Sequence, residues 1–162
     1  MPVINGDFSG ASLEPWVSSA ATGETEGKVE YIRGGNVCVD AAANCHSSTI
    51  IRMTAPITGA RYVAISQTFT AAPSTTYKLS ILLNSRYGGA NGVTGIQALY
   101  QGANLGTYAA NTPSIELYFK TISFWEFTTD ATGVGKLEIR VLNQGGLAGQ
   151  YNYLDDIMVT RK

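Results

Sequence analysis

Planar amides, an arginine and tyrosines are grouped in three short segments of the chain: Asn84-Ser85-Arg86-Tyr87, residues 97–101, and Asn143-Gln144. Amide and guanidinium groups form hydrogen bonds in pairs, which suits the neighbouring hydroxyls of a sugar. Aromatic rings stack on the apolar C–H faces of the same ligands. The candidate ligand-binding residues are Arg86, Tyr87, Gln97, Tyr100 and Gln144. The alternative for each tyrosine is a place in the core of a β-sandwich, which we expect for Trp125 and Phe127.

Strand periodicity limits which of these side chains can meet. Apolar residues occupy the odd positions 77–83, and we expect them to face the core, so Arg86 is predicted on the opposite face. Gln97 and Tyr100 are three positions apart and cannot share a face of a regular strand. A bulge, or a place in a turn, would be needed for both to reach one ligand.

Groups suited to catalysis are scarce. The chain has a single histidine, His46, and no nucleophile motif of the G-x-S-x-G type. Glycoside hydrolysis needs two carboxylates across a cleft. Glu116, Glu126 and Glu138 lie in predicted strands, where each alternates with apolar residues and is expected to face solvent. We therefore predict that the protein is not an enzyme, and a pair of these glutamates forming a site is the alternative.

One carboxylate near the C-terminus is predicted to point inward. Period two places Asp155 on the same face as Ile157 and Val159, which should belong to the core. An inward carboxylate is costly unless it is paired, hydrogen-bonded or bound to a metal.

The two cysteines, Cys38 and Cys45, stand close together in the segment CVDAAANC. This spacing, between two strand-like segments, favours a short disulfide loop of the kind found in secreted proteins. The alternative is a pair of free thiols in a cytosolic protein.

Length and composition define the class of protein. A chain of 162 residues is expected to form one domain, covering residues 1–162. Charged residues make up only 14% and the net charge is -1, which argues against a nucleic-acid partner. No apolar run is long enough to span a membrane, and we expect no membrane partner. A monomer is expected.

Alternating apolar and polar residues, separated by clusters rich in glycine and asparagine, predict strands throughout the chain. The predicted strands cover residues 2–8, 27–33, 36–41, 48–55, 61–70, 76–86, 94–100, 105–109, 115–128, 136–143 and 151–160. So many strands with these turns predict an all-β fold, a β-sandwich jelly roll of two antiparallel sheets.

Several short motifs, in a fixed order along nearly the whole chain, carry a family resemblance. The motifs are Asn5-Gly6-Asp7-Phe8, Trp16, Gln67-Thr68-Phe69, Pro73, Tyr77-Lys78-Leu79-Ser80, Trp125-Glu126-Phe127 and Tyr153-Leu154-Asp155-Asp156-Ile157. This order resembles the carbohydrate-binding modules of families 4, 9 and 22. Those modules are galactose-binding-like β-jelly rolls, often attached to secreted enzymes that degrade polysaccharides.

The resemblance implies a ligand groove on a concave sheet and a structural calcium ion. In such modules calcium is held by an aspartate of the last strand and by oxygens of the N-terminal segment, which match Asp155, Asp7 and the Asn5 carbonyl here. The family commonly has glutamate after the phenylalanine, where this chain has Ser9. The alternative is that Asp155 binds backbone N–H groups with no metal.

The predicted function is non-catalytic binding of a polysaccharide or oligosaccharide, of the β-glucan or xylan type, by a secreted and fungal protein. Two alternatives from other classes stay open. One is a secreted surface, adhesion or structural protein, and the other is a small polysaccharide-active enzyme.

Overall fold

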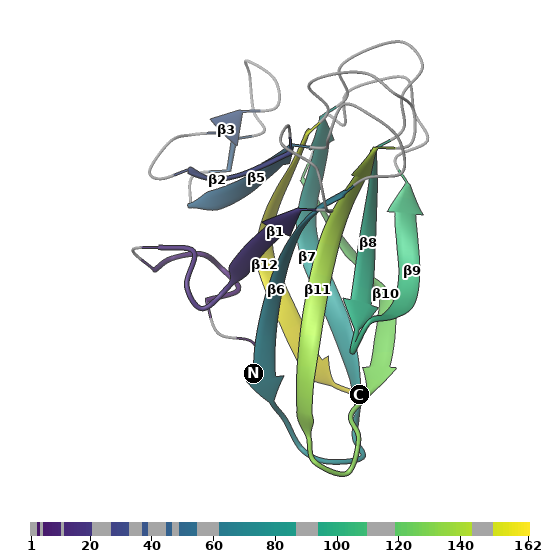
Figure 1. Cartoon of the computed structure of the whole chain (residues 1–162). Helices are drawn as coiled ribbons and strands as arrows, with labels where there is room; N and C mark the ends of the chain where they lie inside the picture. The colour runs from purple at the N-terminus through teal and green to yellow at the C-terminus, as the bar shows by residue number, and fades with distance from the viewer. Residues whose placement is uncertain are drawn as a thin grey trace.

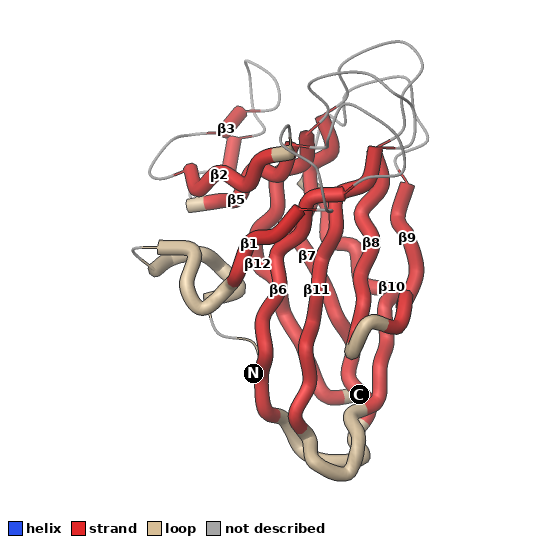
Figure 2. Tube along the Cα trace, viewed as in Figure 1, coloured by secondary structure: helices blue, strands red, loops and turns tan. Residues whose placement is uncertain are grey.

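The computed structural model describes residues 3, 5–10, 12–20, 27–32, 37–38, 45–46, 49–54, 62–86, 94–109, 119–143 and 151–162. Within these ranges the regular structure consists of strands, drawn red in Figure 2, and no residue is helical. The described part of the chain accordingly contains no apolar helix of membrane-spanning length.

The strands form two five-stranded antiparallel sheets packed face to face, the arrangement of a β-sandwich jelly roll (Figure 1). Sheet A has the order β1 (Val17–Ala20), β6 (Tyr62–Thr70), β11 (Val134–Asn143), β8 (Thr94–Tyr100) and β9 (Ala103–Ala109). Sheet B has the order β10 (Lys120–Thr128), β7 (Thr76–Arg86), β12 (Tyr151–Arg161), β5 (Ile50–Thr54) and β2 (Lys28–Ile32). A separate small ribbon pairs β3 (Val37–Cys38) with β4 (Cys45–His46). The predicted fold class is confirmed.

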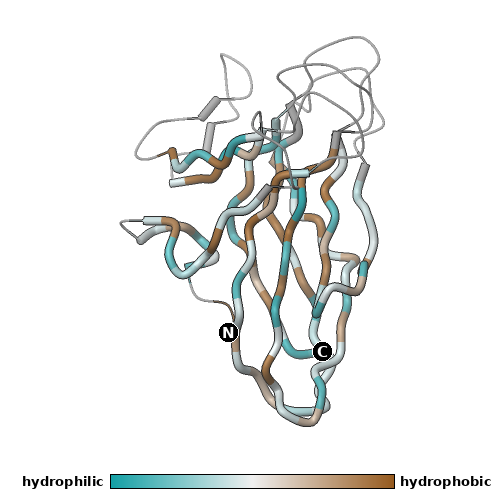
Figure 3. Tube along the Cα trace, viewed as in Figure 1, coloured by the Kyte–Doolittle hydropathy of each residue, from teal (hydrophilic) through white to brown (hydrophobic). Residues whose placement is uncertain are grey.

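Alternation along the strands builds the core between the two sheets (Figure 3). On β7 the predicted inward residues 77–83 at odd positions are all buried, and Trp125 and Phe127 of β10 join them as expected. Opposite them, sheet A contributes the buried positions 63, 65 and 69 of β6 and 137, 139 and 141 of β11. Every second side chain of a strand therefore leaves the core and forms an outer face of its sheet.

Tight turns at one end of the sandwich connect the two sheets. The Asp130 carboxylate accepts hydrogen bonds from the Thr132 N–H at 2.8 Å and the Gly133 N–H at 3.1 Å, which closes the turn between β10 and β11. Gly133 has φ +70°, and a Cβ there would lie 2.2 Å from the Ala71 carbonyl oxygen. Only glycine fits this position, because the neighbouring turn passes directly against it.

The N-terminal segment differs from the prediction. Its described residues between 3 and 8 form bends and turns, so the strand predicted over residues 2–8 is wrong, and β1 begins only at Val17. The Gly6 carbonyl accepts the Ile157 N–H at 2.8 Å, and the Asn5 carbonyl accepts the Trp16 indole N–H at 3.1 Å. A Cβ on Gly6 would lie 2.0 Å from the Ile157 carbonyl oxygen. The segment is therefore fixed against β12 by close backbone contact that a regular strand carrying side chains would not allow.

Candidate functional site

The outer face of sheet A brings polar side chains of three neighbouring strands together. Because Ile65, Ile139 and Ala98 belong to the core, the residues that alternate with them face outward. The register then places one outward row across β6, β11 and β8, made of Ala64, Arg140 and Gln97. A second outward row consists of Ser66, Glu138 and Leu99.

Arg140 is the centre of this face. Its Nε donates a hydrogen bond to Glu138 Oε1, and its guanidinium carbon lies 4.0 Å from the centre of the Tyr62 ring. Lys136 Nζ lies 3.9 Å from the other carboxylate oxygen of Glu138. The Arg140 side chain is 24% exposed and that of Glu138 is 17% exposed. A guanidinium stacked on a ring and paired with a carboxylate has a fixed plane, and it still reaches solvent here.

Two short residues lie on the strand next to these larger side chains. Ala64 is fully buried and Ser66 is only 6% exposed, although both point away from the core. They stand directly beside Arg140 and Glu138 in the register. The face thus combines a guanidinium and an amide, which can hold the hydroxyls of a ligand in a defined orientation.

Gln97 is the predicted ligand residue that lies on this face, where it is half-buried and directly opposite Arg140. Tyr100 lies in the core instead, 8% exposed, with its ring stacked on Phe127 at 4.3 Å between centroids. Its ring occupies the space left by Gly135, where a Cβ would come within 2.3 Å of it. Its assignment as a ligand-binding residue is therefore corrected, because strand alternation and this glycine direct the ring between the sheets.

The other predicted ligand residues do not join Gln97 on one strand surface. Arg86 belongs to β7 in sheet B, where it pairs in register with Tyr151, whereas Gln97 belongs to sheet A. The two residues therefore come from different layers of the sandwich. Tyr87 and Gln144 lie outside the described residues.

Tyr62 and Arg140 belong to this face but were not among the ligand-binding residues predicted from the sequence. Both alternate with core residues and are therefore outward, a signal that period two already contains. Their neighbourhood depends on the order β6-β11-β8, which joins strands far apart in the sequence. Nothing in the local pattern indicates that order.

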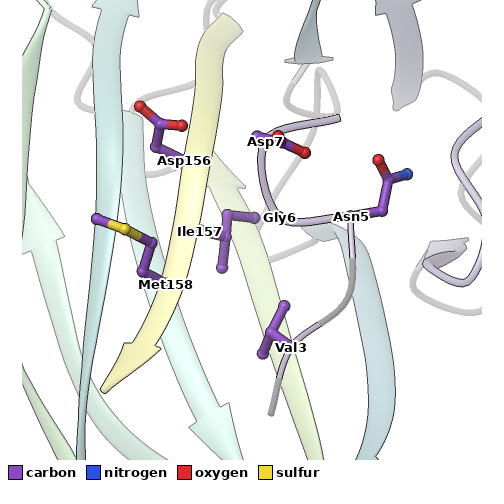
Figure 4. Close-up of a pocket in the computed structure, with 7 residues that line it drawn as sticks. All are labelled: Val3, Asn5, Gly6, Asp7, Asp156, Ile157 and Met158. Carbon is purple, nitrogen blue, oxygen red and sulfur yellow. The ribbon is translucent and has the colours of Figure 1, made fainter. Parts of the chain in front are cut away.

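A second feature is a pocket with a volume of about 360 Å³ between the N-terminal segment and β12 (Figure 4). Its lining comprises Val3, Asn5, Gly6, Asp7, Asp156, Ile157 and Met158. Asp7 and Asp156 are its acidic residues, and Figure 4 shows their carboxylates pointing away from each other. The lining includes Asp156 in place of the predicted Asp155.

The direction of Asp155 differs from the prediction. A β-bulge between Asp155 and Met158 shifts the register, so Asp155 pairs with Leu82 and faces away from the core, while Ile157 faces inward. The extra residue reverses the alternation along β12. Asp155 is nevertheless 1% exposed, and its carboxylate accepts the Asp156 N–H at 2.8 Å.

The predicted calcium ligands do not form one set of free oxygens. The Asn5 carbonyl accepts the Trp16 indole N–H, and Asp7 Oδ1 accepts two hydrogen bonds from Ser9, at 3.2 Å from N and 3.0 Å from Oγ. The described residues contain no group of three or more His, Cys, Asp or Glu side chains placed to hold a metal. Calcium at Asp7 and Asp155 stays a prediction, and this arrangement does not favour it.

The cysteines occupy matching positions in the small ribbon. Cys38 of β3 is the register partner of Cys45 of β4. Directly opposite residues of antiparallel strands have Cα atoms about 4.5–5.5 Å apart, within the range that a disulfide spans. The backbone pairing favours the predicted bond, which itself stays a prediction.

Comparison with known proteins was informative only at the level of structure. No protein-family profile matches the sequence. No curated protein sequence matches it either.

Solved structures with a similar fold cover nearly the whole chain. TmCBM61, solved in complex with β-1,4-galactotriose, has a TM-score of 0.63 at 18% identity and covers 99% of this chain and 97% of its own. A CBM4 structure has a TM-score of 0.59 at 17% identity, with 98% and 99% covered. The Stig cyclase Fisc from Fischerella sp. TAU has a TM-score of 0.63 at 18% identity, with 99% and 96% covered. The expected jelly-roll resemblance is confirmed at the level of the fold, which binding modules and enzymes share.

Proposed function

We propose that this protein is a non-catalytic polysaccharide-binding module and that the outer face of sheet A is its binding surface. The observation that carries the proposal is the Arg140 guanidinium, held by Glu138 and by the Tyr62 ring, with Gln97 as its register partner on the neighbouring strand. A fixed guanidinium and an amide can each bind a pair of sugar hydroxyls. The sequence resemblance to carbohydrate-binding modules and the fold of TmCBM61 and CBM4 support the same function.

The carboxylate on this face supports binding over hydrolysis. Glu138 is engaged by both Arg140 and Lys136, so its role here is to position the guanidinium. An inverting or retaining glycosidase needs a second carboxylate about 5–10 Å away. The described outward residues of β6, β11 and β8 are otherwise neutral apart from Lys136 and Arg140. We therefore propose a neutral ligand of the β-glucan or xylan type, contacted through hydroxyls.

The cellular setting is part of the proposal. We propose that the protein is secreted and of fungal type. Secretion is consistent with a Cys38–Cys45 disulfide, because disulfides persist in oxidising compartments. The register pairing of the two cysteines supports this disulfide.

Affinity electrophoresis tests the function. The probes are soluble xylan, mixed-linkage β-glucan, β-1,3-glucan and β-1,4-galactan, the last because TmCBM61 was solved with β-1,4-galactotriose. We expect at least one polysaccharide to retard the wild-type protein and Arg140→Ala to migrate faster in that gel. The matched control is Arg161→Ala, which removes an exposed arginine at the end of β12.

The electrophoresis and an assay for released products separate the alternatives. Retardation by none of the four polysaccharides would favour the adhesion or structural role. Release of reducing ends or unsaturated products during incubation would favour an enzyme, a possibility that the similar fold of Fisc keeps relevant. Retardation that is equal for wild type and Arg140→Ala would keep the function and discard this face as the site.

Salt should change the retardation little, because a neutral sugar has no charge to screen.

A further inference from the structure

The outer face of sheet B carries a second arginine with the same type of surroundings as Arg140. Arg52 Nε donates a hydrogen bond to Glu30 Oε2 at 2.8 Å. The Arg52 guanidinium carbon lies 5.4 Å from the centre of the Tyr151 ring. Each sheet thus presents an arginine that is paired through Nε with a glutamate and placed over a tyrosine.

The direction of this second group follows from its neighbours in the core. Ile51 and Met53 of β5 are fully buried in the core, so Arg52 between them faces outward. Leu154 of β12 is also in the core, which turns its neighbour Tyr153 outward. The register aligns Glu30, Arg52 and Tyr153 in one row across β2, β5 and β12.

Aromatic rings extend this row. Tyr151 and Tyr153 meet edge to face with centroids 5.4 Å apart, and Phe119 lies 6.4 Å from Tyr153. Tyr153 is 8% exposed, and burial raises the pKa of its hydroxyl. Tyr153 is the register partner of Arg52 on the neighbouring strand. The guanidinium is therefore held by the Glu30 carboxylate and lies over the Tyr151 ring.

The held arginine still reaches solvent. The Arg52 side chain is 34% exposed and that of Glu30 is 39% exposed, both more than their counterparts Arg140 and Glu138. An ordered guanidinium costs little further entropy when it binds a pair of hydroxyls. The half-buried Tyr151 ring beside it offers an apolar surface of the kind that sugars stack on.

We propose that the Arg52–Tyr151–Tyr153 group is a second glycan-binding site, so that the module binds polysaccharide on both faces of the sandwich. This inference rests on the proposed function. The two sheets of a sandwich are about 10 Å apart and their outer faces point in opposite directions. One straight stretch of polysaccharide cannot contact both faces, but two chains can. The protein therefore cross-links polysaccharide chains.

The experiment uses the full chain and the polysaccharide that retards the wild-type protein most strongly. Calorimetry with a short oligosaccharide of that polymer measures the number of sites, and turbidity of the polymer on protein addition measures cross-linking. We expect two sites and turbidity for wild type. Arg52→Ala, Tyr151→Ala and Arg140→Ala should each leave one site, abolish turbidity and lower avidity for the immobilised polymer roughly 10²-fold.

Controls distinguish this proposal from its alternatives. Arg161→Ala should retain two sites, and sedimentation of the ligand-free protein should show a monomer, since a dimer could cross-link through one face only. Unchanged melting temperatures would show that the variants fold. One site in wild type, or loss of all binding in Arg140→Ala, would overturn the second site and leave the proposed function intact. Absence of any binding by wild type would overturn both.

Discussion

Gln97 of β8 and Arg140 of β11 are direct cross-strand neighbours, so an amide and a guanidinium project from one face of sheet A. Side chains in such a pair have Cβ atoms about 4.5–5.5 Å apart, close enough to bind adjacent hydroxyls of one sugar ring. Neither residue is close to the other in sequence. The antiparallel register between their strands creates the pair.

Gln97→Ala should weaken polysaccharide binding less than Arg140→Ala does. A neutral hydrogen bond contributes about 0.5–1.5 kcal/mol, whereas bonds from a charged group contribute about 1.5–3 kcal/mol. Calorimetry with the retarding polysaccharide measures both losses. Gln101→Ala is the matched control, because this exposed amide lies in the turn after β8. Equal affinity for wild type and Gln97→Ala would remove Gln97 from the site.

Tyr100 should respond to substitution as a core residue. Tyr100→Ala should lower the free energy of unfolding by about 3–5 kcal/mol, the usual cost of deleting a buried aromatic ring. Tyr100→Phe should be neutral or stabilising, because the buried hydroxyl has no hydrogen-bond partner within the described part of the chain. Urea unfolding followed by tryptophan fluorescence measures both changes. If Tyr100→Phe instead weakens polysaccharide binding and leaves stability unchanged, the Tyr100 hydroxyl contacts ligand after all.

Cys38 and Cys45 should be joined in protein purified under oxidising conditions. Intact mass should be two hydrogens lighter than after reduction, and thiol labelling should modify neither cysteine. The double substitution Cys38→Ser and Cys45→Ser should cost about 2.5 kcal/mol of stability, as a loop of this size gains in the chain-entropy model. Labelling of both thiols in the folded, oxidised protein would refute the bond.

Calcium binding at the N-terminal segment is tested by melting curves with EDTA and with added calcium. A ligand that binds only the native state raises the melting temperature by mass action. If Asp7 and Asp155 hold an ion, EDTA should lower the melting temperature, and Asp155→Asn should remove that sensitivity. The hydrogen bonds that already engage Asp7 and the Asn5 carbonyl lead us to expect a small response or none. A clear shift with calcium would show that the segment rearranges to admit it.

The Arg52–Glu30 pair should be visible in a carboxyl titration. The hydrogen bond from Arg52 holds the pKa of Glu30 below its ordinary value of 4.5. The stabilisation from the pair is therefore complete above pH 4.5 and is lost as the pH falls through the lowered pKa of the folded state. Both side chains are about one-third exposed, so the pair contributes only roughly 0.2–1 kcal/mol.

Arg52→Ala provides the check on this titration. Removing the guanidinium should raise the pKa of Glu30 in carbon-detected NMR, because the largest cause of its depression is gone. Arg161→Ala should leave the titration of Glu30 unchanged. A Glu30 pKa that does not move in Arg52→Ala would show that the two side chains are apart in solution, and it would weaken the second binding site as well.

Local pattern alone determined most of the strands and, on a regular strand such as β7, which side chains face the core. The alternation on β7, from Tyr77 to Leu83, predicted the inward residues correctly, because a strand has a side-chain period of two in any fold. The alternation of apolar and polar residues and the frequent turn residues likewise predicted two antiparallel sheets. Trp125 and Phe127 were placed in the core for the same reason.

Tertiary structure alone decided which outward residues meet. Arg86 belongs to a strand of sheet B and Gln97 to a strand of sheet A, and this separation follows from strand order. The bulge in β12 reversed the direction of Asp155, because one extra residue in a strand with a side-chain period of two moves the side chains before it to the opposite face. Tyr100 faces inward on the even side of β8, and Gly135, distant in sequence, leaves room for its ring. Alternation assigns a side chain to one of two faces, and only long-range strand pairing determines what lies on that face.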